Sequence, residues 1–176
     1  MKKVVKFGGS SLASAEQFEK VGAIIRADKD RRYVVPSAPG KRFSGDTKVT
    51  DMLYGCYDLA EAEKDFKKEL DAIKARYDEI ITGLKLTLDL TNDFKIIEKN
   101  FKAKAGKEYA ASRGEFLNGK VMSEYLGFPF VDSAEVIFFN EDGEFDAERT
   151  QTVLSARLSK MDCAVVPGFY GSYGRG

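Results

Sequence analysis

The chain has 176 residues, 43% of them hydrophobic, and its 28 lysines and arginines balance 28 aspartates and glutamates. This composition is typical of one globular domain with a real core, and the absence of net charge argues against a nucleic acid partner. Apolar runs are short, and too little hydrophobic sequence follows Lys2 and Lys3 for a signal peptide. We therefore expect a cytoplasmic protein without a membrane partner.

Histidine is absent from the sequence. Its absence excludes Ser-His-Asp and Cys-His triads, histidine metal sites and imidazole acid–base catalysis. Phosphoryl transfer to a carboxylate fits this limit, because a carboxylate is ionised at pH 7 and needs no general base. Cys56 and Cys163 lie far apart without a CxxC partner, so we expect free, buried thiols and no disulfide framework.

The first predicted strand, at Val4-Val5, runs into Lys6-Phe7-Gly8-Gly9-Ser10-Ser11. A glycine pair can turn the backbone through conformations closed to other residues, so that several N–H groups and a hydroxyl face one anion. The capping-box pattern Ser14 to Gln17 then opens a helix. The segment predicts a phosphate site, although a simple tight turn would use the same residues.

A second buried strand is predicted at 32–36, where it ends in the proline and glycine turn Ser37-Ala38-Pro39-Gly40. Together with the first strand and helix it indicates a βαβ unit. Residues 41–48 are polar and predict a loop. Helical spacing begins at Val49, which places Thr47 or Thr50 near a helix N-terminus.

Two amphipathic helices are predicted between residues 61 and 103. In the first, from Glu61 to Ile81, apolar residues recur at steps of three and four, and we interpret the charges between them as a solvated face. Gly83 breaks the pattern, and a further helix carries Phe94, Ile97 and Phe101. We interpret the pair as a helical hairpin packed against the sheet domain; binding of a partner is the alternative.

The apolar stretch 109–126 predicts another helix, with Gly114 and Glu115 near its start. A glutamate in such a helix is anomalous, because a buried carboxylate is costly unless a cation pairs with it. Glu115 therefore either faces solvent or awaits a cation.

The last third of the chain predicts strands at 129–131, 135–139 and 164–167, a turn at 140–143 and a helix at 147–158. Alternating strands and helices favour an α/β fold, a three-layer αβα sandwich with a mostly parallel sheet. Three Gly-Lys pairs precede Arg, Glu and Val, so none forms a Walker A loop, and no GxGxxG is present. Any phosphate loop is of another type.

Four ordered stretches resemble motifs of the aspartate kinases, within the amino-acid kinase superfamily. They are Lys6-Phe7-Gly8-Gly9-Ser10-Ser11, then Ser37-Ala38-Pro39-Gly40 with Val49-Thr50-Asp51-Met52-Leu53, then Ser112-Arg113-Gly114-Glu115, and finally Pro167-Gly168-Phe169-Tyr170-Gly171-Ser172. The resemblance implies that 1–176 is the N-terminal, substrate-binding lobe of the kinase domain. The nucleotide lobe and the regulatory domains are absent from it.

The resemblance also implies a reaction and its residues. ATP, with Mg²⁺, would phosphorylate the β-carboxylate of L-aspartate for lysine, threonine and methionine biosynthesis, in a full-length enzyme expected to be a homo-oligomer. Lys6 would be catalytic, and no residue is assigned to a metal. The phosphates would contact Lys6, Phe7, Gly8, Gly9 and Ser10, and the amino acid would contact Ser11, Ser37, Thr50, Glu115 and Arg175.

The end of the chain departs from the family pattern. The family continues into Arg-Gly-Gly-Ser-Asp, whereas here Gly171-Ser172 is followed by residues 173–176 alone. We therefore expect a truncated chain with weak ATP affinity and little turnover. We also expect it to self-associate through an exposed apolar face and an open sheet edge. The alternatives are a glutamate or carbamate kinase, disfavoured by the hairpin and by Ser112–Glu115, and a non-catalytic binding module.

Overall fold

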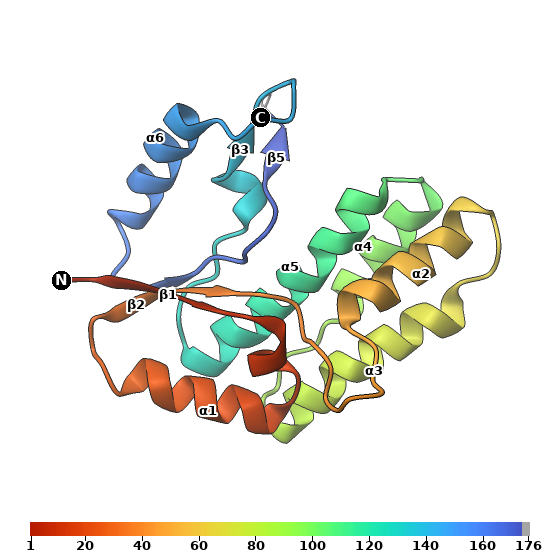
Figure 1. Ribbon diagram of the computed structural model, residues 1–176, viewed down its shortest axis with the longest axis horizontal. Helices are drawn as coiled ribbons and strands as arrows, with labels where there is room; N and C mark the ends of the chain where they lie inside the picture. Colours follow the sequence, from red (N-terminus) through yellow and green to blue (C-terminus); the bar gives the residue numbers. More distant parts are fainter. Residues whose placement is uncertain (174–176) are drawn as a thin grey trace.

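A central parallel sheet organises the computed structural model, which describes residues 1–173 (Figure 1). Strands β1 (Lys3–Phe7), β2 (Arg31–Pro36) and β4 (Ala164–Val165) form it in the order β1-β2-β4. Helices α1 (Ala15–Arg26) and α5 (Lys107–Leu126) pack on one face, and α6 (Ala147–Leu158) lies on the other side. The α/β fold with a mostly parallel sheet is confirmed.

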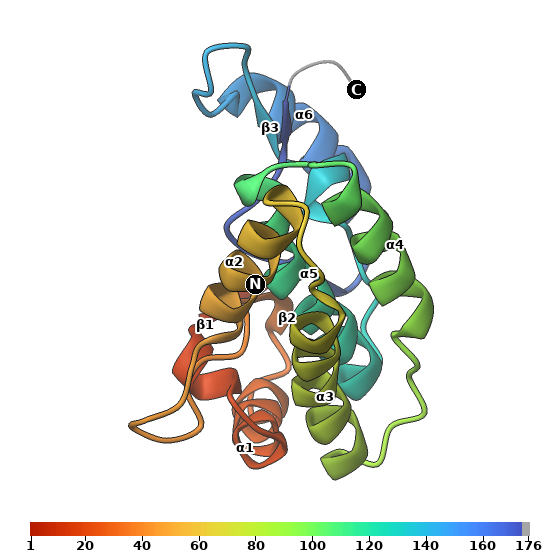
Figure 2. The same cartoon turned by 90° about the vertical axis from the view of Figure 1, so that its right-hand side faces the viewer.

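The helices α2 (Val49–Glu61), α3 (Lys67–Gly83) and α4 (Thr91–Lys102) form a bundle with α5 (Figure 2). The expected hairpin corresponds to α3 and α4, which pack mainly on α2 and α5, and α3 also contacts α1. Their apolar faces join one core with α1 and the sheet, which includes Leu53, Tyr57, Ile73, Phe101 and Leu117.

The predicted start of the hairpin at Glu61 was wrong. Glu61 is the last residue of α2, and α3 begins only at Lys67. The break has a local cause: Glu63 adopts the left-handed conformation with φ of 58°, and the N–H of Lys67 donates to the Asp65 carboxylate at 3.0 Å. A side chain that accepts from a first-turn N–H favours a new helix start at that point.

The strands predicted at 129–131 and 135–139 were largely wrong. Residue Phe130 makes only an isolated bridge to Val165, and Ser133–Glu135 forms a 3-10 turn. Asp132 explains the change, because its carboxylate accepts the N–H of Ala134 at 3.0 Å and starts that turn. What remains is β3 (Phe138–Phe139), which pairs in parallel with β5 (Ser172–Tyr173) in a separate two-stranded sheet.

The two cysteines differ in burial. Cys56 is fully buried in α2, as expected, with its thiol 3.8 Å from the carbonyl oxygen of Phe66. Cys163 is half-buried, so the expectation of a buried thiol fails there; it lies just before the short edge strand β4. Within residues 1–173, no helix is long and apolar enough to cross a membrane.

An apolar groove of about 370 Å³ opens between the sheet and α6. It is lined by strand residues such as Val4, Tyr33 and Val35, by Leu154 and Leu158 of α6, and by the loop that carries Phe169. Val4 is 67% exposed. The groove agrees with the expected open apolar face, while self-association itself stays a prediction.

Candidate functional site

Three loops meet at the carboxyl edge of the parallel sheet. The N–H of Ser37, after β2, donates to the carbonyl oxygen of Phe7 at 3.1 Å. The N–H of Gly168, after β4, donates to that of Pro36, also at 3.1 Å. In open α/β sheets, ligands bind outside the carboxyl ends of the strands. The first and second sequence motifs and the strand exit at 167–172 thus share the edge where a ligand is expected.

Gly9 and Gly40 bring two of these loops into backbone contact. The N–H of Gly40 donates to the carbonyl oxygen of Gly9 at 2.8 Å, and a Cβ on Gly9 would lie 2.9 Å from the carbonyl oxygen of Ala38. The expectation that the pair Gly8-Gly9 adopts conformations closed to other residues was wrong, since Gly8 has φ of −79° and Gly9 has no positive φ. Close approach, not turn geometry, requires Gly9.

A 3-10 turn, Gly9–Leu12, separates the glycine pair from α1. The capping prediction is confirmed, because Ser14 is the N-cap of α1 and its hydroxyl accepts the N–H of Gln17 at 3.3 Å. Ser10 is exposed and Ser11 half-buried within the turn. The hydroxyl of Ser10 is therefore accessible to a ligand.

Glu115 is the unusual charge of this region. It lies on α5 with only 8% of its surface exposed, and among the described residues it has no ion-pair partner. Burial raises the pKa of Glu115 to about 7, opposed by the N–H of Ala38 and by the charge of Arg113. Of the two alternatives left by the sequence, exposure to solvent is excluded and a carboxylate without its cation remains.

Close packing at Gly114 brings Thr50 and Ala38 to the same part of α5 as Glu115. A Cβ on Gly114 would lie 2.8 Å from that of Ala38 and 3.9 Å from the hydroxyl of Thr50. Ser37 is buried beside Ala38. The structure thus brings together the predicted residues Ser37, Thr50 and Glu115.

Lys6 lies on strand β1, and its side chain contacts Phe169. Its ammonium is 4.2 Å from the ring centre of Phe169, which is 72% exposed and has a left-handed φ of 66°. Among the described residues no ion pair joins Lys6 and Glu115, which belong to strand β1 and helix α5 respectively. Phe7 is half-buried against the core, and Arg175 lies outside the described residues.

Comparison with known proteins decides the family. The family model for the amino acid kinase family matches residues 1–176. The chain belongs to the amino acid kinase family. It is 32% identical to Aspartokinase 3 of Bacillus subtilis (strain 168) over 183 residues, which cover 96% of this chain and 40% of that protein.

Solved structures show where the family fold recurs. An aspartate kinase of Clostridium acetobutylicum matches all of this chain and 41% of its own, with a TM-score of 0.95 and 44% identity. An E. coli aspartokinase III, solved with aspartate and ADP, covers all of this chain and 42% of its own, with a TM-score of 0.78 and 22% identity. This amino acid kinase chain therefore spans about two fifths of the length of each of these three relatives.

Two buried polar side chains of this amino acid kinase chain hydrogen-bond to backbone groups of the site, and no sequence pattern predicted either contact. The side-chain amide of Asn118, on α5, donates to the carbonyl oxygen of Ser37 at 2.7 Å, and its side-chain oxygen has no hydrogen-bond partner within residues 1–173. The hydroxyl of Tyr77, on α3, donates to the carbonyl oxygen of Gly114 at 2.7 Å. In the sequence, Tyr77 is one of the apolar residues that recur at steps of three and four between Glu61 and Ile81.

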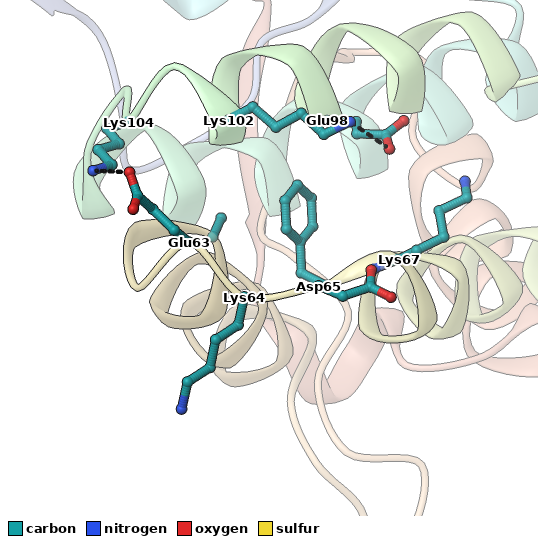
Figure 3. A pocket seen from close by; sticks show the side chains of 9 residues that line it. Glu63, Lys64, Asp65, Lys67, Glu98, Lys102 and Lys104 are labelled. Atoms are coloured by element: carbon teal, nitrogen blue, oxygen red, sulfur yellow. Dashed lines mark hydrogen bonds and ion pairs between the residues drawn. The ribbon is translucent and has the colours of Figure 1, made fainter.

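A larger hollow, of about 480 Å³, lies at the other end of the bundle, between the segment that follows α2 and the end of α4 (Figure 3). Four of the charged groups that line it pair with one another, Lys104 with Glu63 at 3.3 Å and Lys102 with Glu98 at 3.4 Å. Ala60, the residue of α2 that lines it, lies about 15 Å along the helix from Thr50, at 1.5 Å of rise per residue. None of the predicted site residues lines it.

Proposed function

We propose that residues 1–176 form the amino-acid-binding lobe of an aspartate kinase, which transfers the γ-phosphate of ATP to the β-carboxylate of L-aspartate. The buried carboxylate of Glu115, without a cation among the described residues, carries this proposal. The ammonium of an amino acid would supply the missing charge and return the pKa of Glu115 toward its ordinary value. The similarity to two aspartate kinases supports aspartate as that amino acid.

The remaining roles follow from the places of the residues. Thr50 and Ser37 flank Ala38 and Gly114, so we assign them, with Ser11, to the amino acid beside Glu115; Arg175 is the proposed partner of its α-carboxylate. Lys6 is exposed at the end of β1, where its charge can stabilise the transferring phosphoryl group. The proposed phosphate contacts are Lys6, Phe7, Gly8, Gly9 and Ser10.

The proposed reaction needs no base from the protein. An oxygen of the substrate β-carboxylate forms the new bond to the γ-phosphorus, and the bond from that phosphorus to the bridging oxygen of ADP breaks. The leaving oxygen of ADP takes the electron pair. Because the carboxylate attacks without losing a proton, the lack of histidine is no obstacle.

The nucleotide and its metal belong to the proposal as well. An E. coli aspartokinase III was solved with ADP and aspartate, which supports ATP as the phosphoryl donor. Residues 1–173 contain no group of three or more acidic, cysteine or histidine side chains placed to hold a metal ion. We expect Mg²⁺ to be held by the nucleotide phosphates, as is common for this ion.

Calorimetric titration of the chain with L-aspartate tests the proposal. We expect binding that weakens at least about tenfold in Glu115→Gln, because the buried partner of the ammonium loses its charge. The control Glu124→Gln changes an exposed carboxylate on the same helix and should leave the affinity unchanged. Hydroxylamine trapping of the acyl phosphate should show little turnover by these 176 residues.

Two outcomes would contradict the proposal. Equal affinity of the wild type and Glu115→Gln for L-aspartate would remove the assigned role of Glu115. Tighter binding of L-glutamate than of L-aspartate would indicate another amino-acid kinase.

A further inference from the structure

Arg76 is a buried charge on a helix remote in sequence from every predicted site residue. It lies on α3 with 5% of its surface exposed, among the apolar residues that face the core. The interpretation of the charges of this helix as a solvated face is wrong at this position. A guanidinium out of water is costly unless hydrogen-bond acceptors surround it, and burial lowers the pKa of Arg76.

The acceptors of Arg76 are the two ends of one loop. One guanidinium nitrogen donates to the carbonyl oxygen of Gly40 at 2.9 Å, and the other donates to that of Thr47 at 3.0 Å. Asp46 of the same loop lies 3.5 Å from Arg76 and is also bound by Arg42 at 2.7 Å. Because the two donors of a guanidinium are held in a fixed fork, Arg76 sets the separation of the loop ends.

Each end of the loop leads directly to the candidate site. The N–H of Gly40 donates to the carbonyl oxygen of Gly9, in the proposed phosphate loop, at 2.8 Å. At the other end, the N–H of Val49 donates to the carbonyl oxygen of Pro39 at 3.1 Å, and Thr50 follows in the first turn of α2. Movement of this loop would therefore shift Gly9 and Thr50 relative to each other.

Tyr77, the residue after Arg76 on α3, contacts α5 on the other side of the candidate site. Tyr77 donates to the carbonyl oxygen of Gly114, which precedes Glu115. Consecutive residues of α3 thus contact the loop that leads to Thr50 and the helix that carries Glu115. The hairpin is attached to both sides of the site.

We propose that Arg76 is a positioning residue, which fixes the loop 40–47 so that Thr50 and Gly9 are placed for the substrate facing Glu115. The nature of that substrate rests on the proposed function, whereas the fixing of the loop does not. Arg76 touches no reacting atom in this arrangement. The helical hairpin then acts as a brace for the substrate site.

Amide hydrogen exchange in Arg76→Met and Arg76→Lys tests the brace independently of any ligand. We expect exchange at Gly40 and Val49 to accelerate in Arg76→Met, while amides of α6, such as that of Thr150, keep their rates. Arg76→Lys keeps the charge but lacks the fork, so it should restore protection only in part. Arg26→Met is the control for loss of an arginine that donates to a backbone carbonyl oxygen elsewhere, because the exposed Arg26 donates to that of Tyr125 and, within the described part of the chain, makes no hydrogen bond or ion pair with residues 40–47.

Titration with L-aspartate supplies the second readout. A misplaced loop should weaken binding about tenfold in Arg76→Lys, because small displacements of binding groups have large effects, and Arg26→Met should bind as the wild type does. If the wild type does not bind aspartate, the proposed function fails and the exchange data still decide the role of Arg76. Unchanged exchange at Gly40 and Val49 in both variants, or a uniform increase along the chain, would overturn the proposal.

Discussion

The two ends of helix α2 carry charges in opposite ways. At its N-terminal end, Arg76 and Glu115 are almost fully buried. Arg76 donates to two backbone carbonyl oxygens and has Asp46 at 3.5 Å, whereas Glu115 has no ion-pair partner among the described residues. At its C-terminal end, Lys104 and Glu63 line the larger hollow, 49% and 81% exposed, and neutralise each other. A buried charge that lacks its counterpart, more than the size of a cavity, indicates where a ligand is needed.

The largest predicted effect on the free energy of unfolding concerns the protonation of Glu115, at the N-terminal end of α2. The pKa of Glu115 rises from 4.5 to about 7 on folding, so the folded chain holds this proton more tightly than the unfolded chain. The resulting stability is complete below about pH 4.5 and is lost as the pH rises toward 7. At 1.36 kcal/mol per pKa unit, Glu115→Gln should be about 3 kcal/mol more stable than the wild type at pH 8.

Urea unfolding between pH 5 and pH 8 measures this difference. The advantage of Glu115→Gln should shrink steadily toward acid, and L-aspartate should stabilise the wild type more than the variant at pH 8. Parallel pH profiles of the two proteins would show that Glu115 is not the strained charge described above.

A smaller effect, of about 2 kcal/mol, is expected where α5 approaches the site loop. Gly114→Ala would place a Cβ 2.8 Å from that of Ala38 and force α5 away from the loop, whereas a Cβ on Gly55 meets nothing within 4 Å. Gly55→Ala should instead stabilise α2 by up to about 1 kcal/mol through helix propensity. Thermal unfolding followed by circular dichroism compares the two, and equal shifts would refute tight packing at Gly114.

The smallest effect is expected at the hollow. A double-mutant cycle of Glu63→Ala and Lys104→Ala should give a coupling energy below about 0.5 kcal/mol, because both side chains are largely solvated. Urea unfolding of the four proteins supplies the cycle. A coupling energy well above 1 kcal/mol would show that the ion pair at the C-terminal end of α2 is strong, which would contradict the difference described between the two ends of the helix.

Sequence patterns predicted the elements whose causes are local. The helix Ala147–Leu158 has the predicted bounds, and the strand that ends at Pro36 and the cap at Ser14 also agree. The strand at 135–139 failed where the carboxylate of Asp132 turns the chain, a competition that alternation of apolar residues does not reveal.

The candidate site was only partly accessible from sequence. Motifs identified Glu115 and the glycine pair Gly8-Gly9 as site residues. The position of Glu115 within an apolar helix can also be recognised from the sequence alone. Arg76 looked like one more charge on an amphipathic helix, because its acceptors, Gly40 and Thr47, are 36 and 29 residues away. Periodicity describes which face a residue occupies, not which distant backbone group meets it.

The buried thiol of Cys56 makes opening of the helical bundle chemically observable. Burial raises the pKa of Cys56 to about 12, and only the thiolate reacts readily with alkylating reagents. Modification of Cys56 at neutral pH therefore awaits a fluctuation that separates α2 from Phe66, the residue just before α3. Cys163 is half-buried and would react first. The delay between the two modifications therefore measures how rarely α2 separates from the start of α3, the helix that carries Arg76.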